Sequence, residues 1–274
     1  MMNLADLGRR GLVLLGCGKM GSALLEGWLG RGLALNSVWV TEPFPSDWLK
    51  GLAARGLHLN APLPDAPAVV LVAVKPQMMA EALPTLGALG GGGTLFLTVA
   101  AGTPIAFYER TLGPGTPVIR AMPNTPAAVG RGITAITGNP LASEDHLALA
   151  EALLSAVGQV VRLEGEHQMD AVTALSGSGP AYVFHLIEAL AAAGEAEGLP
   201  APLAMQLARA TVTGAGELAH RAPETAAQLR INVTSPGGTT AAALAVLMDA
   251  DTGLGPLMQR AVKAAADRGR ELAR

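Results

Sequence analysis

A short apolar run that ends in a glycine-rich turn constrains the fold of this chain more than any other feature. Residues 11–16 read Gly-Leu-Val-Leu-Leu-Gly, and the turn that follows, residues 16–21, has the spacing G-x-G-x-x-G. Apolar residues then recur at a helical spacing from Lys19 to Leu29. A continuous apolar run bounded by glycines is typical of a strand buried on both faces, so the sequence predicts a strand, a tight turn and a helix.

The same alternation continues through the first part of the chain. Further strands are predicted at 38–40, 68–74, 94–99 and 118–119, and helices fit between them at 46–55, 77–89 and 103–112. Parallel strands need crossover connections, which are usually helices. The predicted fold class is therefore α/β, with an N-terminal Rossmann-like, doubly wound parallel sheet.

The pattern changes near residue 164. Segments rich in Ala and Leu follow with helical spacing, and no further strand is predicted; the helices are expected at 180–197, 202–220, 223–229, 239–248 and 256–273. We therefore expect a dinucleotide-binding domain at 1–164 and an all-α domain at 165–274. Only 3% of the residues are aromatic. Because the helical half has few large side chains, we expect it to complete its core against a second copy, as a homodimer.

Composition excludes several classes of partner and site. The chain is 50% hydrophobic and 15% charged with a net charge of −3, so neither a nucleic-acid partner nor a membrane partner is expected. No apolar run approaches the roughly 20 residues of a membrane helix, and we expect a cytoplasmic protein. Cys17 is the one cysteine and the five histidines are scattered, so no metal site is expected and Cys17 is interpreted as a small filler.

The glycine-rich turn predicts a dinucleotide site. Gly16 permits the tight turn, Gly18 lets the backbone approach a pyrophosphate at the helix N-terminus, and Gly21 allows the helix to pack closely against the strand. Lys19 and Met20 belong to the same turn and are counted among the expected contacts.

Glu42, at the end of the second predicted strand, fits the acid that binds the ribose hydroxyls in such sites. Its charge would repel a 2′-phosphate, and no arginine lies between residues 41 and 50, which favours NADH. The alternative is that Pro43 and Pro45 turn Glu42 into solvent, so the choice between NADH and NADPH stays open.

Three further strand ends carry residues suited to ligand contact, because ligands of open α/β sheets lie beyond the carboxyl ends of the strands. They are Val74-Lys75-Pro76, Ala100-Ala101-Gly102, and Asn124 in the loop 120–126. The small residues of the second would let a flat ring approach the backbone, and two prolines fix the third. Each could instead be an ordinary strand end or turn.

Two polar, glycine-rich loops interrupt the helical half. They read Ser-Gly-Ser-Gly-Pro at 176–180 and Thr-Ser-Pro-Gly-Gly-Thr-Thr at 234–240. Each places hydroxyls and backbone N–H groups at a helix N-terminus, which suits an anion such as a carboxylate, although plain helix capping is the alternative. No acid–base pair stands out, which fits a reaction whose chemistry a cofactor supplies.

With these motifs in this order, the chain resembles the pyrroline-5-carboxylate reductases, which catalyse the last step of proline biosynthesis. The matching segments are G-C-G-K-M-G at 16–21, A-V-K-P at 73–76, A-A-G at 100–102, R-A-M-P-N-T-P at 120–126, L-S-G-S-G-P-A-Y at 175–182 and S-P-G-G-T-T at 235–240. The resemblance implies reduction of the C=N bond of 1-pyrroline-5-carboxylate to L-proline by NADPH or NADH. It also implies a dimer with interleaved helical domains, assembled in some members into decamers.

The motifs and the resemblance together give the expected site residues. The expected cofactor contacts are Gly16, Gly18, Lys19, Met20, Gly21, Glu42, Asn60, Val74, Lys75, Pro76, Ala100, Ala101, Gly102 and Asn124. The expected substrate contacts are Ser176, Ser178, Val233, Ser235, Gly237, Gly238, Thr239 and Thr240. Thr240 resembles the catalytic hydroxyl beside the ring nitrogen, and Ser176 or Ser178 is the alternative. Many members have an Asp where this chain has Ile231, so that carboxylate cannot be required here.

Two other interpretations share parts of this plan. A dehydrogenase of the β-hydroxyacid type would need a catalytic lysine on the helical domain, and residues 165–262 contain none. A non-catalytic nucleotide-binding regulator would bind the cofactor without turnover and would have a degraded substrate loop, whereas residues 234–240 are intact.

Overall fold

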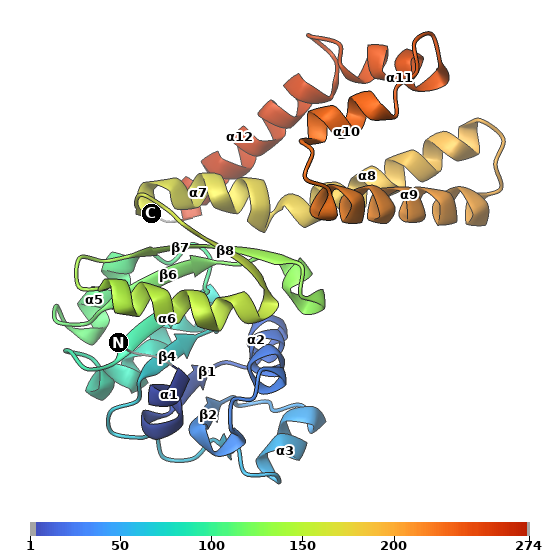
Figure 1. Cartoon of the computed structure of the whole chain (residues 1–274). Coiled ribbons are helices and arrows are strands. Elements are labelled where there is room, and N and C mark those ends of the chain that lie inside the picture. Colours follow the sequence, from blue (N-terminus) through green and yellow to red (C-terminus); the bar gives the residue numbers. More distant parts are fainter. Residues whose placement is uncertain (1–3, 273–274) are drawn as a thin grey trace. The chain divides into compact units, whose positions relative to one another are not determined.

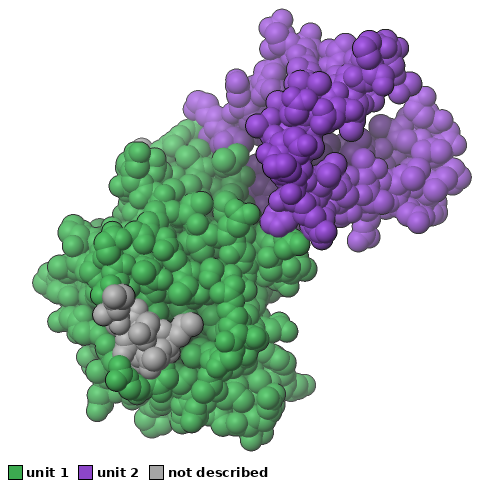
Figure 2. Space-filling view, in the orientation of Figure 1, with its two compact units in different colours: residues 1–177, 266–274 green, residues 178–265 purple. Residues whose placement is uncertain are grey.

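A computed structural model describes residues 4–272, and contacts between Cα atoms divide the chain into two compact units. Unit 1 consists of the residues up to 177 together with those from 266 onward, and unit 2 consists of residues 178–265 (Figure 2). The predicted domain boundary between residues 164 and 165 stays a prediction, since the compact units divide the chain later.

Unit 1 contains one eight-stranded sheet with the order β3-β2-β1-β4-β5-β6-β7-β8 (Figure 1). The strands are β1 (Leu12–Leu15), β2 (Val38–Thr41), β3 (His58–Leu59), β4 (Val69–Val72), β5 (Leu95–Thr98), β6 (Val118–Met122), β7 (Gly132–Gly138) and β8 (Gly158–Arg162). The expected α/β fold is confirmed, and within residues 4–272 no strand follows Arg162.

The sheet departs from the expected parallel arrangement at one pair, β6 and β7, which is antiparallel. Residues 123–131 between them contain only the 3-10 turn Thr125–Val129. A parallel return would need a crossover of a dozen or more residues, so the chain turns back beside β6 instead. The strands β3, β7 and β8 were not predicted.

Helices cover the sheet as a doubly wound fold requires. They are α1 (Leu4–Arg10), α2 (Lys19–Gly30), α3 (Asp47–Ala53), α4 (Met79–Ala82), α5 (Ile105–Leu112), α6 (Glu144–Leu154) and α7 (Met169–Val172). The single helix predicted at 77–89 was wrong, because a 3-10 turn, the short α4 and the 3-10 stretch Leu83–Leu89 occupy that segment. Pro84 lacks the N–H that an α-helix would need there.

The buried strands separate two apolar layers. Leu12 and Leu14 of β1 belong to one cluster, with α2 and α6, whereas Val13 and Leu15 belong to the other, with α4 and α5. Because side chains alternate along a strand, β1 supplies both layers and has no solvent face. The continuous apolar run in the sequence reflects this double burial.

Unit 2 is helical and lightly packed. It contains α8 (Gly179–Ala196), α9 (Ala201–Arg221), α10 (Ala226–Asn232), α11 (Thr239–Leu247) and the larger part of α12 (Leu254–Leu272). The pair α8 and α9 approaches closely at small residues, since a Cβ on Gly194 would lie 3.4 Å from the Cβ of Ala204. The buried apolar residues of these two helices are the alanines Ala191, Ala204 and Ala208.

Large apolar side chains of unit 2 remain exposed in the single chain. They include Val183, Phe184, Leu186, Leu190, Leu203, Leu207, Leu218, Val246, Leu247 and Met248. A surface of this extent is typical of an interface with another protein. No helix within residues 4–272 combines the length and the apolar character needed to cross a membrane.

We expect the protein to be a homodimer in which this apolar surface of unit 2 is covered. Light scattering at micromolar concentration should give twice the chain mass of 27.8 kDa. Replacing Phe184, which is 59% exposed on α8, by Ser should raise the dimer dissociation constant about tenfold or more, because buried aromatic side chains dominate such interfaces. Phe44→Ser is the matched control, since Phe44 lies in unit 1 and is 87% exposed. A monomeric mass with full activity would contradict the expectation.

Candidate active site

The parallel strands bring most of the predicted cofactor residues to one edge of the sheet. In the observed register Leu15 lies beside Thr41 and Val72, and Val72 lies beside Thr98. The carboxyl ends of β1, β2, β4 and β5 therefore align. The residues that follow them, from Gly16, Glu42, Ala73 and Val99 onward, form the edge where ligands of such sheets bind.

The three glycines of the first turn have different physical roles. Gly16 has φ +89°, and a Cβ there would lie 2.9 Å from a methyl of Val74. A Cβ on Gly21 would overlap the carbonyl oxygen of Gly16. By contrast, Gly18 has φ −70°, which any residue adopts, and no atom lies within 4 Å of the position of its Cβ. The fold requires Gly16 and Gly21, whereas the space beside Gly18 is open and fits an approaching pyrophosphate.

Gly18 is also the residue at which α2 begins. It is the N-cap of this 12-residue helix, and it has no side chain to cap the first turn. The positive end of the helix dipole and the backbone N–H groups of the first turn favour an anion here. Lys19 is exposed, whereas the side chain of Met20 packs against the apolar core.

The carboxylate of Glu42 is held beside this turn. Its Oε2 accepts a hydrogen bond from the backbone N–H of Cys17 at 2.8 Å, and its Oε1 accepts one from the N–H of Phe44 at 3.0 Å. Glu42 is therefore not directed into solvent, despite the prolines at 43 and 45. The backbone of Glu42 is in turn bonded to the side chain of Asn60.

Cys17 lies in the same turn, and its thiol has a low reactivity. Burial, with a smaller contribution from the neighbouring charge of Glu42, raises the pKa of the Cys17 thiol to about 11. The thiol is neutral near pH 7, and a neutral thiol is a poor nucleophile. This agrees with the interpretation of Cys17 as a small filler.

The ends of β4 and β5 supply an exposed lysine and a loop of small residues. Val74 packs against Gly16, and the exposed Lys75 precedes the 3-10 turn Pro76–Met78. After β5, the N–H of Ala100 donates to Oγ1 of Thr98 at 3.2 Å, and Gly102 has φ +73°. Ala101 between them is exposed, so this loop offers backbone and a methyl group to a flat ring.

Two polar residues of the predicted site have structural partners in unit 1. Oδ1 of Asn124 accepts a hydrogen bond from the N–H of Ile133 at 3.0 Å, which fixes the start of β7. The hydroxyl of Ser176 donates to the carbonyl of Val172 at 3.1 Å, within the π-helical segment Thr173–Gly177. The next residue, Gly177, packs so closely on Met122 at the end of β6 that a Cβ would lie 2.5 Å from its terminal methyl.

The remaining predicted substrate residues lie in unit 2. Gly237 has φ +68°, the N–H of Gly238 donates to the carbonyl of Ser235 at 3.0 Å, and Gly238 is the N-cap of α11. Thr239 and Thr240 form the first turn of that nine-residue helix. Ser178 is the N-cap of α8, and Val233 is 64% exposed.

An ion pair between a buried arginine and a half-buried glutamate, next to the β5 loop, was missed by the sequence reasoning. Arg120 of β6 is 5% exposed, and its Nη1 lies 2.7 Å from Oε1 of Glu166. The same oxygen accepts a hydrogen bond from the N–H of Ile105 at 2.8 Å. Glu166 therefore fixes the start of α5, directly after the Ala100–Gly102 loop. The motif at 120–126 singled out Arg120, but no pattern in the sequence pointed to Glu166.

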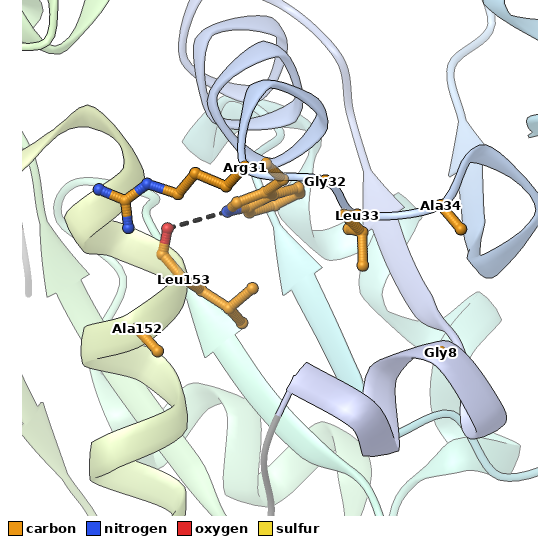
Figure 3. A pocket seen from close by; sticks show the side chains of 8 residues that line it. Gly8, Arg31, Gly32, Leu33, Ala34, Ala152 and Leu153 are labelled. Atoms are coloured by element: carbon orange, nitrogen blue, oxygen red, sulfur yellow. Dashed lines mark hydrogen bonds between the residues drawn. The ribbon is translucent and has the colours of Figure 1, made fainter.

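A cavity of about 220 Å³ lies away from these residues (Figure 3). It is lined by Gly8, Trp28, Arg31, Gly32, Leu33, Ala34, Ala152 and Leu153. The indole N–H of Trp28 donates to the carbonyl of Leu153 at 2.8 Å and closes one side. Since the helices α2 and α6 end here and strands begin, the cavity lies at the amino edge of the sheet, opposite the predicted cofactor edge. Within residues 4–272 no group of three or more His, Cys, Asp or Glu is placed to hold a metal ion.

Comparisons with known sequences agree with the resemblance. Residues 166–272 match the family model described as pyrroline-5-carboxylate reductase dimerisation, and residues 11–102 match the one described as NADP oxidoreductase, coenzyme F420-dependent. A pyrroline-5-carboxylate reductase of Synechocystis sp. is 42% identical, covering 95% of this chain and 97% of its own. One of Pseudomonas aeruginosa is 37% identical, covering 96% of each chain.

Solved structures give the same result. A pyrroline-5-carboxylate reductase of Coxiella burnetii superposes with a TM-score of 0.87 at 34% identity, covering 97% of this chain and 99% of the other. A pyrroline carboxylate reductase of Plasmodium falciparum with NADP bound has a TM-score of 0.79 at 26% identity, with the same coverage.

We expect Gly18→Val to reduce the affinity for NADH and NADPH at least a hundredfold while the fold survives. The valine side chain would fill the open space beside the helix N-terminus, where no atom of the protein lies within 4 Å of the Cβ position. The loss of stability should be about 1 kcal/mol or less, because only an N-cap glycine is changed. Cofactor affinity is measured by fluorescence titration and stability by urea unfolding.

Gly21→Ala is the matched control and should behave in the opposite way. Its methyl group would overlap the carbonyl oxygen of Gly16, so unfolding should require clearly less urea than for the unaltered protein. Unchanged cofactor affinity in Gly18→Val would show that the pyrophosphate does not bind at this turn.

Proposed function

The chain belongs to the pyrroline-5-carboxylate reductase family, and we propose how its own residues hold the cofactor and the substrate of that reaction. It is an NAD(P)H-dependent oxidoreductase of proline biosynthesis that reduces the C=N bond of 1-pyrroline-5-carboxylate to L-proline. The observation that carries the residue assignment is the open space beside Gly18, which is the one glycine of the turn 16–21 that the fold does not itself require.

We propose that the turn 16–21 holds the pyrophosphate and that the loop Ala100–Gly102 faces the nicotinamide. When bound, the reduced nicotinamide supplies the hydride that adds to the imine carbon. The small residues of this loop, of which Ala101 is exposed, would let the ring lie against the backbone, and Lys75 and Pro76 of the neighbouring strand end would flank it. Holding the two reacting carbons in contact can lower the barrier by roughly 7–11 kcal/mol, so positioning accounts for much of the catalysis.

The position of Glu42 favours NADH over NADPH. Its carboxylate lies beside the turn, where the ribose 2′ position of a bound dinucleotide is expected. At about 4 Å and an effective dielectric constant near 20, each unit of phosphate charge would be repelled by about 4 kcal/mol. No arginine lies between residues 41 and 50 to offset this, and Ser46 already caps α3 by accepting the N–H of Leu49.

We propose that the loop 234–240 holds the substrate. The turn around Gly237 and Gly238 would bind the carboxylate at the N-terminus of α11, together with Ser235. The hydroxyl of Thr240 would bond the ring nitrogen and steady it while the nitrogen changes from a protonated imine to an amine. The exposed side chain of Val233 would offer an apolar contact for the ring, and Ile231 supplies no carboxylate at its own position.

The assembly is proposed from the helical region. The match of residues 166–272 to a dimerisation model supports a homodimer, and the exposed apolar surface of unit 2 supplies an interface. Assembly into a decamer and a cytoplasmic location stay predictions, as does the absence of a nucleic-acid partner.

We expect the purified protein to oxidise NADH in the presence of 1-pyrroline-5-carboxylate, with kcat/KM for NADH at least equal to that for NADPH. Loss of absorbance of the reduced nicotinamide measures both. Glu42→Ser should raise kcat/KM for NADPH about tenfold or more relative to NADH, because the repulsion of the 2′-phosphate disappears.

Glu26→Ser is the charge-matched control for this experiment, because Glu26 is exposed on α2 and should leave the cofactor ratio unchanged. A tenfold preference of the unaltered protein for NADPH would show that Glu42 does not face the ribose. Absence of turnover with either cofactor would contradict the proposed reaction.

We expect Thr240→Val to lower kcat/KM by up to about a hundredfold, the size of one positioned polar contact, and Thr240→Ser to be milder. The valine keeps the shape of the side chain and removes the hydroxyl. If Thr240 only supported the start of α11, the valine variant would lose about 1 kcal/mol of stability without a change in turnover. In that case the contact with the ring nitrogen would have to be assigned to Ser176 or Ser178 instead.

A further inference from the structure

Asn60 has an unusual backbone conformation and a side chain whose two polar atoms are both hydrogen-bonded. It directly follows β3, and it is the one residue other than glycine with positive φ, at +50°, in the part of the chain that the structure describes. Its N–H donates to the carbonyl of Val40 at 2.8 Å, which continues the β2–β3 pairing by one step. Beyond this point the backbone turns away from β2.

Beyond Val40, the side chain of Asn60 replaces the backbone of β3 as the hydrogen-bonding partner of the residues that follow β2. Its Nδ2 donates to the carbonyl oxygen of Glu42 at 2.9 Å, and its Oδ1 accepts the N–H of Glu42 at 2.9 Å. One amide group therefore satisfies both backbone groups of a single residue, as an adjacent strand would. This fixes the backbone of Glu42 immediately before Pro43.

The fixed backbone of Glu42 determines where its carboxylate lies. With its main chain held by Asn60, the side chain reaches the N–H of Cys17 in the glycine turn and the N–H of Phe44. Without Asn60, the backbone of Glu42 would lose both of these hydrogen bonds at the start of the segment that contains Pro43 and Pro45. The carboxylate would then exchange between the turn and solvent.

We propose that Asn60 is a positioning residue that sets the selectivity between NADH and NADPH by holding Glu42 at the glycine turn. The inference rests on the proposed function of Glu42. Both polar atoms of the Asn60 side chain are bonded to the backbone of Glu42, and on this proposal Asn60 acts on the cofactor through Glu42.

The variant Asn60→Gly separates the side chain from the backbone conformation. Glycine adopts φ +50° without strain, so the turn after β3 is retained and only the two amide bonds to Glu42 are lost. Equilibrium dissociation constants for NADH and NADPH are measured by fluorescence titration without substrate, so that the readout is independent of turnover. Urea unfolding of each variant reports any general loss of stability.

Asn60→Gly should shift the ratio of the two dissociation constants about tenfold toward NADPH. In a protein that already carries Glu42→Ser, the same change should shift the ratio less than twofold, because no carboxylate remains to be positioned. Non-additivity of this kind in a double-mutant cycle is the signature of two residues that act as one unit.

Three results would overturn the inference. Equal weakening of both cofactors by Asn60→Gly would give Asn60 a purely structural role. If Asn60→Gly left the ratio of the two dissociation constants unchanged while the unaltered protein prefers NADH, Asn60 would have no role in selectivity. The proposed role of Glu42 would still stand. A tenfold preference of the unaltered protein for NADPH would contradict the proposed function of Glu42. The role of Asn60, which depends on it, would then be contradicted as well.

Discussion

The contact between the start of α2 and the end of β1 is the constraint on which the rest of the site depends. Gly21 lies so close to the carbonyl of Gly16 that no side chain fits between them, and Gly16 itself lies against Val74. This approach directs the N-terminus of α2 at the carboxyl edge of the sheet. The parallel register then places the ends of β2, β4 and β5 around the same point, so the candidate cofactor site follows from backbone geometry before any polar side chain contributes.

The sequence predicted strands whose burial is one-sided or complete, except β7, which was missed although most of its residues are buried, and it also missed strands whose burial is partial. β1, β4 and β5 are buried along their whole length, and their apolar runs were recognised. β8 alternates between exposed and half-buried residues, and β3 has two residues, so neither gives a continuous pattern. The helix α6 was missed although Ser143 caps it, because His146 stands at the position where a capping box usually has Glu or Gln.

The candidate site could be predicted only where the type and spacing of a residue suggest its role. The glycines and Glu42 can be recognised from their spacing, since the fold requires glycine at 16 and 21 and an acid about 20 residues further on is the residue expected to bind a ribose. The partners of these residues could not be predicted. The amide of Asn60 meets Glu42 because β3 pairs with β2, and Glu166 meets Arg120 because residues distant in the chain converge beside α5. Such contacts depend on tertiary structure, which local patterns do not encode.

On the proposed role of Glu42, the way in which its side chain is held would let one carboxylate recognise one cofactor and reject the other. Its carboxylate accepts hydrogen bonds from the N–H groups of Cys17 and Phe44, which are neutral backbone donors. They orient the carboxylate but leave its full negative charge. An ionised carboxylate has about four acceptor positions, so roughly two remain for the hydroxyls of a ribose. A 2′-phosphate offers no donor for those positions and adds negative charge. On this proposal, selectivity needs no steric block: the same two unfilled acceptor positions attract a hydroxyl and repel a phosphate.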